Sequence, residues 1–175
     1  MVAHLLDSEK HIGEVGGAVL GAFASFTRPA DTTAYASGDL ASNSTTAALV
    51  QPLELVVARK PRGSGMVRRV KLEKSGTSVT ASSFRIHFYG SLPSVVNGDN
   101  AAWSTPKADY LGAVDITIAK AFSDGAAGYG VPEIGAEINY YPATGKSVWC
   151  LIEARDVYTP ASAEVFTVTV EALPN

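Results

Sequence analysis

Short runs rich in β-branched and aromatic residues recur along the whole chain, and turn residues bound each of them. This recurrence limits the possible folds most, because such runs are typical of strands in all-β proteins. The runs are 18–27, 53–58, 65–73, 83–89, 112–119, 134–141, 147–155 and 164–173, and a short segment at 33–37 is a candidate ninth. Between them lie glycine, proline, asparagine and aspartate, the residues that favour turns. No segment combines helical periodicity with capping residues, so the pattern predicts an all-β protein.

Alternation within the runs indicates which side chains face a core. Phe84, Ile86 and Phe88 share one face of the run 83–89, and the polar side chains between them share the other. Alternation is poorer in 65–73, where Arg68 falls on the apolar side. The run 147–155 is apolar on both faces, as expected of a central or an interface-covered strand.

Eight to nine strands with long connections predict an antiparallel two-sheet sandwich, of which the jelly roll is the eight-stranded form. The chain has 175 residues, the usual size of one domain. Residues 1–17 are polar and contain several glycines, so we expect a flexible N-terminal arm there. Residues 18–175 are expected to form a single β-sandwich domain.

Composition excludes several classes of protein. Hydrophobic residues make up 46% of the chain, which excludes a disordered protein. The formal net charge of -3 argues against a nucleic-acid partner. The N-terminus carries charges where a signal peptide would be apolar, and the apolar run 15–26 contains three glycines and is shorter than the about 20 residues of a membrane span. We therefore expect no membrane partner and folding in a cytoplasm.

Candidate catalytic residues are few, and the sequence predicts a protein that is not an enzyme and holds no cofactor or metal. The single cysteine, Cys150, lies in the most apolar run, where a thiol is typically an inert small hydrophobe. The histidines His4, His11 and His87 lack the spacing of a zinc site. A cupin-type enzyme needs a metal-binding histidine cluster, so that class is excluded as well. His87 is interpreted as an ordinary outward residue of its strand. The glycines at 128–130 lack the rest of a phosphate-binding motif.

The loop 97–100 (Asn-Gly-Asp-Asn) offers oxygen ligands of the kind that Ca²⁺ binds. It is too short for a calcium-binding loop of the EF-hand type and has no distal glutamate at the required spacing. We interpret it as a simple Asn-Gly turn.

Half of the basic residues of the chain lie in the segment 59–74, which has one acidic residue, Glu73. Six of them are candidate partner-binding residues: Arg59, Lys60, Arg62, Arg68, Arg69 and Lys71. The glycines at 63 and 65 predict a hairpin tip within the segment. One interpretation is a solvated hairpin whose charges discourage aggregation. The other is a basic face that docks on an acidic protein partner.

Three stretches carry a resemblance to a known group of proteins: 27–39 (TRPADTTAYASGD), 84–103 (beginning FRIHF and ending DNAAW) and 158–168 (beginning YTPA). In this order they resemble small proteins that tailed bacteriophages encode near the major capsid gene, among them capsid decoration (cement) proteins. The resemblance spans about residues 22–173. It implies a β-sandwich or jelly-roll module on the capsid exterior, commonly a homotrimer, that binds the major capsid protein and locks neighbouring subunits together. Such a protein is assembled in the host cytoplasm. The resemblance carries over no binding residues.

Three aromatic residues in probable loops favour an alternative. Trp103, Tyr110 and Tyr129 would stack on sugars if they were exposed. The same sandwich would then be a binding module on the virion that recognises a host-surface glycan or receptor. If the rings instead cap the ends of the sandwich, this alternative loses its support.

Overall fold

The computed structural model describes residues 19–175, and these residues form β-strands joined by loops and one short 3-10 turn. The long strands are β1 (Leu20–Thr27), β3 (Leu53–Val56), β4 (Gly65–Lys74), β5 (Ser83–Tyr89), β6 (Tyr110–Thr117), β8 (Gly125–Gly130), β10 (Ser147–Ala154) and β11 (Val165–Pro174). The short strands are β2 (Leu40–Ala41), β7 (Lys120–Phe122) and β9 (Asn139–Tyr140), and the turn is η1 (Ala47–Leu49). The predicted arm, 1–17, lies outside the described residues, so the domain boundaries stay predictions.

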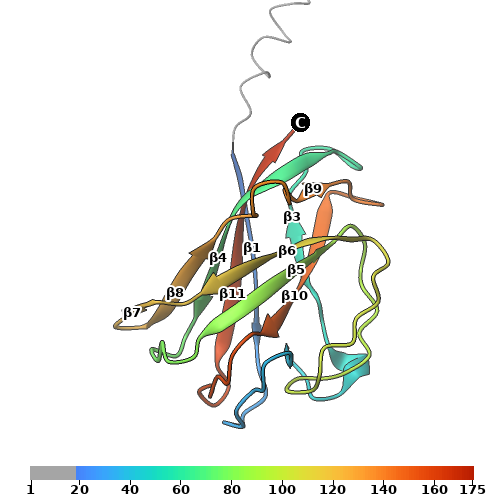
Figure 1. Ribbon diagram of the computed structural model, residues 1–175. Helices are drawn as coiled ribbons and strands as arrows, with labels where there is room; N and C mark the ends of the chain where they lie inside the picture. The colour runs from blue at the N-terminus through green and yellow to red at the C-terminus, as the bar shows by residue number, and fades with distance from the viewer. Residues whose placement is uncertain (1–18) are drawn as a thin grey trace, which may run out of the picture.

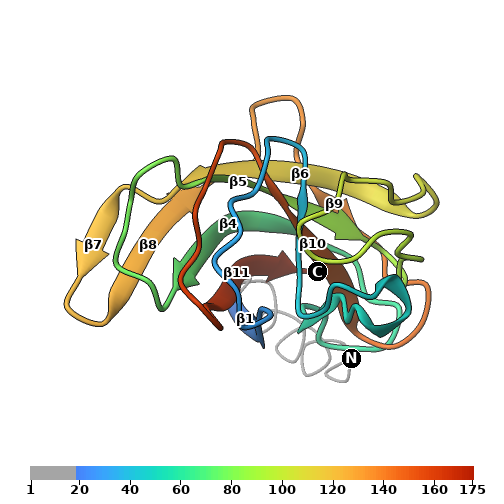
Figure 2. The same cartoon turned by 90° about the horizontal axis from the view of Figure 1, so that it is seen from below.

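The strands form two antiparallel sheets that face each other (Figures 1 and 2). In the first sheet the order is β1-β11-β4-β8-β7, with β9 beside β4; in the second it is β2-β10-β5-β6, with β3 beside β10. The pairing is nested: β5 pairs with β6, β4 with β8, β3 with β10, and β1 with β11. A long hairpin that wraps on itself produces this order, which is that of a jelly roll. The predicted fold class is therefore confirmed.

The core lies between the two sheets and follows the predicted alternation. Phe84, Ile86 and Phe88 of β5 have no exposed surface. The neighbouring strand β10 and the facing strands β4 and β11 contribute side chains that are equally buried: Val148, Cys150 and Ile152 from β10, and Val70, Leu72, Phe166, Val168 and Val170 from the facing sheet. Aromatic contacts join the layers, as where the Phe84 and Phe166 rings meet edge to face at 5.4 Å.

A second, smaller apolar cluster covers the outer face of the second sheet. Leu151 of β10 and Tyr89 of β5 point outward there, and Val95 and Trp103 of the long connection 90–109 pack over them. Strand β10 is central in its sheet, between β5 on one side and β2 and β3 on the other. The chain itself therefore explains why the run 147–155 is apolar on both faces, without a contact between subunits.

Two strand predictions were wrong, and one strand of six residues was missed. Residues 33–37 are not a strand, and within 134–141 only β9 forms one. Strand β8 was missed because its sequence, GAAGYG, has the composition of a turn. Its glycines are required by a close approach of β6: a Cβ at Gly128 would lie 2.4 Å from the Thr117 carbonyl oxygen. At Gly130 the corresponding distance to the Asp115 carbonyl oxygen is 2.6 Å.

Candidate protein-docking surface

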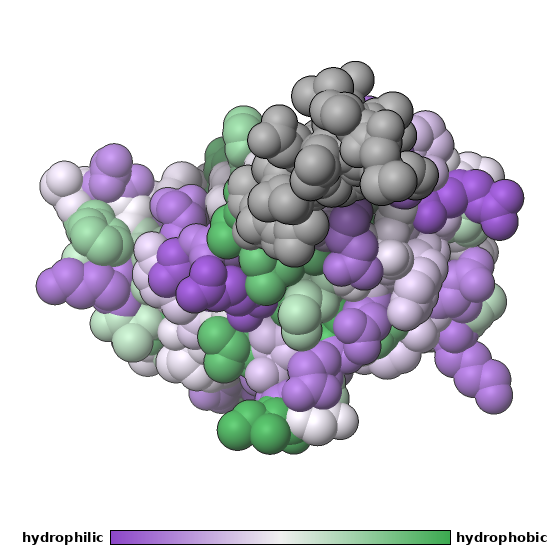
Figure 3. Space-filling view, turned by 90° about the horizontal axis from the view of Figure 1, so that it is seen from above, coloured by the Kyte–Doolittle hydropathy of each residue, from purple (hydrophilic) through white to green (hydrophobic). Residues whose placement is uncertain are grey.

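The basic segment 59–74 is divided between two parts of the molecule. The predicted hairpin was wrong, because β3 pairs with β10 in the second sheet while β4 pairs with β11 in the first. Residues 57–64 instead connect the two sheets. Arg59, Lys60 and Arg62 are exposed in this connection, at the end of the sandwich where β4 begins. Figure 3 views this end, where hydrophilic side chains project at the rim.

Arg68 occupies a β-bulge in β4. The register with β11 shifts there, since Arg69 pairs with Glu171 while Val67 pairs with Ala172. The extra residue lets Val67 and Val70 both face the core, and Arg68 and Arg69 are both exposed. The interpretation that placed Arg68 on the apolar side was therefore wrong, because the bulge changes the alternation.

Acidic neighbours balance the remaining basic residues of β4. Arg69 forms an ion pair with Glu171 on β11, and its guanidinium lies 5.0 Å from the centre of the Tyr129 ring. Lys71 Nζ lies 2.9 Å from Glu73 Oε2 on the same face. The outer face of the first sheet thus carries charges of both signs and is not uniformly basic.

Exposed aromatic side chains flank these ion pairs across the first sheet. Phe23 on β1, Thr169 on β11, Lys71 on β4 and Tyr129 on β8 occupy one row of the strand register. Phe23 is 75% exposed and Tyr129 is 58% exposed. Rings beside arginine are typical of protein interfaces, and large exposed apolar side chains often mark them. We call this outer face, defined by Phe23, Arg69, Lys71, Tyr129 and Thr169, the candidate docking face.

The loop 97–100 contains the predicted turn, and its aspartate also belongs to a buried ion pair. Asp99 Oδ2 accepts a hydrogen bond from Arg28 Nη2 at 2.9 Å, and both side chains are fully buried. Asp99 Oδ1 accepts from the Tyr35 hydroxyl at 2.7 Å and from the Ser42 backbone N–H at 2.8 Å. Arg28 Nε also donates to the Tyr35 hydroxyl, at 2.8 Å. The carboxylate is therefore occupied by protein donors. The chain does turn at Asp99 and Asn100, as predicted, but the interpretation as a simple turn missed the buried ion pair.

A second buried ion pair lies next to the first. Lys74 Nζ lies 3.3 Å from Glu164 Oε1, and the Tyr158 hydroxyl donates to the same carboxylate at 2.7 to 2.8 Å. The Lys74 ammonium also lies 4.8 Å from the centre of the Tyr158 ring. Tyr35 and Tyr158 are stacked with their centres 6.4 Å apart, so the two pairs form one polar assembly.

The three stretches that carry the resemblance meet in this assembly. Arg28 and Tyr35 come from 27–39, Asp99 from 84–103, and Tyr158 from 158–168. Sequence reasoning noted these residues as markers of turns and strand entries. Their contact across the fold was not predictable from spacing, because a buried ion pair leaves no periodic signal.

His87 is outward-facing on β5, as predicted, but it is buried beneath the connection 90–109. Its ring stacks on Trp103 with the centres 4.0 Å apart. Nε2 lies 2.9 Å from Glu153 Oε2 and Nδ1 lies 3.2 Å from the Tyr110 hydroxyl. Because an ionised carboxylate only accepts, Nε2 carries the proton and Nδ1 accepts from Tyr110. Burial lowers the pKa of His87 against the opposing effect of Glu153, so the ring is neutral at pH 7.

The order Tyr110, His87, Glu153 has the connectivity of a nucleophile, a base and an orienting acid. Burial raises the pKa of the Tyr110 hydroxyl, which works against a phenolate nucleophile. Together with the Trp103 stack, the arrangement holds the connection 90–109 against the second sheet.

The aromatic residues expected in loops occupy different environments. Trp103 is in a loop but packs on His87, and Tyr110 begins β6. Tyr129 lies within β8 and remains exposed. Of the three rings, Tyr129 therefore offers the most accessible surface.

The remaining candidate groups are Cys150, His4 and His11, of which the structure describes Cys150. Cys150 is fully buried, and burial raises the pKa of its thiol, in agreement with the prediction of an inert residue. Residues 19–175 bring together no group of three or more His, Cys, Asp or Glu side chains that would hold a metal ion. They also contain no helix long and apolar enough to cross a membrane. His4 and His11 lie outside the described residues.

Comparisons with models of known protein families and with curated proteins find no match. Among solved structures, a chain of the cyanophage Pam1 capsid asymmetric unit is 16% identical with a TM-score of 0.33, and the match covers 91% of this chain and 88% of that chain. A virus-like particle of the extra small virus of the giant freshwater prawn Macrobrachium rosenbergii is 10% identical with a TM-score of 0.24, covering 90% and 80%. A family two carbohydrate esterase from Cellvibrio japonicus is 11% identical with a TM-score of 0.16, covering 89% and 36%. These scores are low, so the fold assignment rests on the strand order of this chain.

Proposed function

We propose that this protein is a structural component of a bacteriophage virion. In this proposal it decorates the outer surface of the capsid and bridges neighbouring capsid subunits. Its partners are the major capsid protein and further copies of itself, arranged as a homotrimer, and it has no catalytic, nucleic-acid-binding or membrane-binding role. It is assembled in the host cytoplasm.

The observation that carries the proposal is the meeting of the three resembling stretches at Arg28, Tyr35, Asp99 and Tyr158. Residues far apart in the chain resemble the phage proteins, and these same residues hold together the loops at one end of the jelly roll. The resemblance therefore marks an architecture, as a structural protein requires, and not a chemical site.

The candidate docking face supplies the means of attachment. Phe23 and Tyr129 offer apolar surface for burial, while Arg69 and Lys71 with their acidic partners offer polar groups that fix orientation. The exposed basic residues Arg59, Lys60, Arg62 and Arg68 remain candidates for contact with an acidic shell.

The test is binding to undecorated phage shells, measured by co-sedimentation. Replacing Phe23 and Tyr129 by serine should abolish most of the binding and leave the melting temperature nearly unchanged, since both rings are exposed. Tyr141→Ser is the matched control, because Tyr141 is 67% exposed but lies outside the docking face. Equal binding by the double variant and the control would refute the docking face.

Counting copies per virion by quantitative mass spectrometry separates decoration from receptor binding. A decoration protein occurs in many copies, in fixed proportion to the major capsid protein. A receptor-binding module occurs in few copies, and the purified protein would bind defined sugars on a glycan array. Few copies together with glycan binding would replace the proposal by the alternative.

A further inference from the structure

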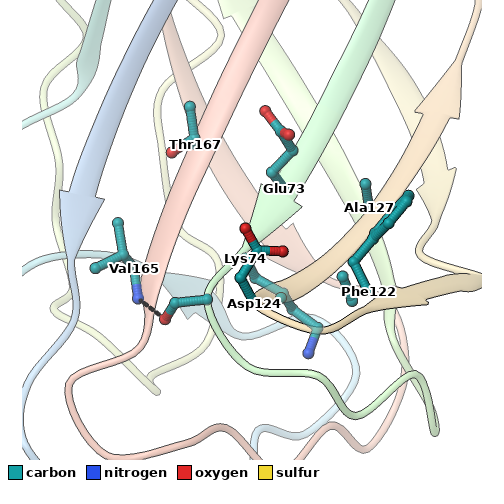
Figure 4. A pocket seen from close by; sticks show the side chains of 10 residues that line it. Glu73, Lys74, Phe122, Asp124, Ala127, Val165 and Thr167 are labelled. Atoms are coloured by element: carbon teal, nitrogen blue, oxygen red, sulfur yellow. Dashed lines mark hydrogen bonds between the residues drawn. The ribbon is translucent and has the colours of Figure 1, made fainter.

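A hollow of about 280 Å³ opens on the outer face of the first sheet, where β4 ends beside the turn of the β7–β8 hairpin (Figure 4). Glu73 and Asp124 contribute carboxylates to its wall, Phe122 contributes a ring that is 52% exposed, and Thr167 contributes a hydroxyl. Such a wall suits a side chain with an apolar stem and a cationic end, because an aromatic ring and carboxylates both attract a cation.

The lysine at the base of the hollow does not neutralise these carboxylates. The Lys74 ammonium lies against Glu164, donates to the Gly76 carbonyl oxygen at 3.0 Å and lies near the Tyr158 ring. Its side chain is fully buried, and its charge is engaged by Glu164. Glu73 pairs with Lys71, and Asp124 forms no ion pair with any residue in 19–175. The hollow thus keeps a negative charge open to a partner.

The opposite end of the same strand carries the complementary group. Lys60 and Arg62 are exposed in the connection 57–64, directly before β4, and neither pairs with a carboxylate among residues 19–175. The connection is held in place by backbone bonds, with the Arg62 N–H donating to the Gly145 carbonyl and the Gly63 N–H to the Lys60 carbonyl at 3.0 Å. The cations are therefore presented on an ordered element.

The two surfaces lie too far apart to meet within one molecule. Strand β4 has ten residues, which at about 3.3 Å per residue separates its ends by about 30 Å. Figure 1 shows the connection at one end of the sandwich and the β7–β8 hairpin toward the other. A contact between them must join two copies head to tail.

We propose that the hollow at Glu73, Phe122 and Asp124 receives Lys60 and Arg62 of a second copy of this chain. The contact is heterologous, since different surfaces of the two copies meet, and repetition of one rotation closes such contacts into a ring. This contact would explain the self-association that is part of the proposed function, and it rests on the proposed function in that one point. It does not involve binding to the shell.

Sedimentation equilibrium at low salt tests the contact in the full-length protein. The wild type should associate, whereas Asp124→Lys and the double variant Lys60→Glu/Arg62→Glu should each be mainly monomeric. Glu54→Lys, at an exposed position of β3, and Lys107→Glu, at an exposed position of the connection 90–109, are matched charge controls that should associate like the wild type. Circular dichroism checks that every variant is folded.

Mixing provides the decisive measurement. The Asp124→Lys variant keeps its basic loop, which can enter the intact acidic hollow of the Lys60→Glu/Arg62→Glu variant. The acidic loop of the second variant can in turn enter the hollow of the first, which carries the introduced lysine. An equimolar mixture of the two variants should therefore associate although neither does alone. A mixture that stays monomeric, variants that associate like the wild type, or a wild type that is monomeric throughout would each overturn the contact. Shell co-sedimentation, measured separately, reports on the proposed function, so a failure of one is not a failure of the other.

Discussion

Arg28 and Asp99 stand 71 positions apart in the chain, and their side chains meet at 2.9 Å with no surface exposed to solvent. The pair joins the loop after β1 to the connection that covers the second sheet. A buried pair is costly to form but very costly to break, because removal of one partner leaves the other charged and unpaired.

Asp99→Asn should therefore lower the free energy of unfolding by about 3–5 kcal/mol. Chemical denaturation monitored by circular dichroism measures the loss. Asp31→Asn is the control, because Asp31 also contacts Arg28, at 3.3 Å, but its side chain is 39% exposed, and its loss should be below about 1 kcal/mol. Similar losses for the two variants would show that the buried pair is not the anchor.

Gly128→Ala should destabilise the protein by about 1–3 kcal/mol, the usual cost of overpacking. The added Cβ would lie 2.4 Å from the Thr117 carbonyl oxygen, which is backbone and cannot rotate away. Gly21→Ala in β1 meets nothing within 4 Å and should be neutral or slightly stabilising. Thermal unfolding of the two variants, compared with the wild type, checks the difference in sign.

Acidification should weaken the fold through His87. Burial lowers its pKa in the folded state, while the unfolded value is about 6.5. The stability that the neutral ring contributes is complete above about pH 6.5 and is lost as the pH falls through the folded pKa, because the unfolded chain then binds a proton that the folded chain excludes. Between pH 8 and pH 5 the wild type should lose more unfolding free energy than His87→Gln. Parallel pH profiles for the two proteins would contradict this assignment.

Reversal of Arg68 and Arg69 to glutamate should weaken attachment to undecorated shells and leave the protein folded. Arg69 loses its exposed ion pair with Glu171, and exposed ion pairs contribute little to stability. Salt should reduce shell binding more in the wild type than in the variant, since exposed charges are screened beyond about 10 Å at 0.1 M ionic strength. Co-sedimentation across a salt series measures both effects. Equal shell binding by the wild type and the variant at low salt would show that Arg68 and Arg69 do not carry the attachment, and the apolar side chains would then have to carry it.

Local alternation predicted those strands whose side chains repeat with period two. Strand β5 matched its predicted bounds because Phe84, Ile86 and Phe88 mark one face over its whole length. Strand β8 could not be predicted, because its glycines are required by the close approach of the β6 backbone, which comes from another part of the sequence. The sheet membership of β3 and β4 is likewise a property of the whole fold, so Gly63 and Gly65 suggested a hairpin that does not form.

The candidate site was predictable only in its residue types. The sequence showed a concentration of basic residues at 59–74, but it did not show that Glu171, on the last strand, pairs with Arg69. The bulge at Arg68 was visible in the sequence as a break in the alternation. It was interpreted as an arginine on the apolar face, whereas an extra residue in the strand causes it. Phe23, Phe122 and Asp124 carried no signal, because exposed aromatic and acidic residues are common on any surface.

The nested strand order also determines when this chain can fold. Strand β1 pairs with β11, so Leu20 lies opposite Ala172, and β11 separates β1 from β4 throughout the first sheet. During synthesis the first sheet lacks its central strand β11 until β11 has left the ribosome, and β1 has no strand to pair with until then. Contacts this distant in sequence close slowly. Every nascent chain therefore passes through a period in which the inner edges of β1 and β4 are open, and each chain must complete its own sheet before it can safely meet another copy.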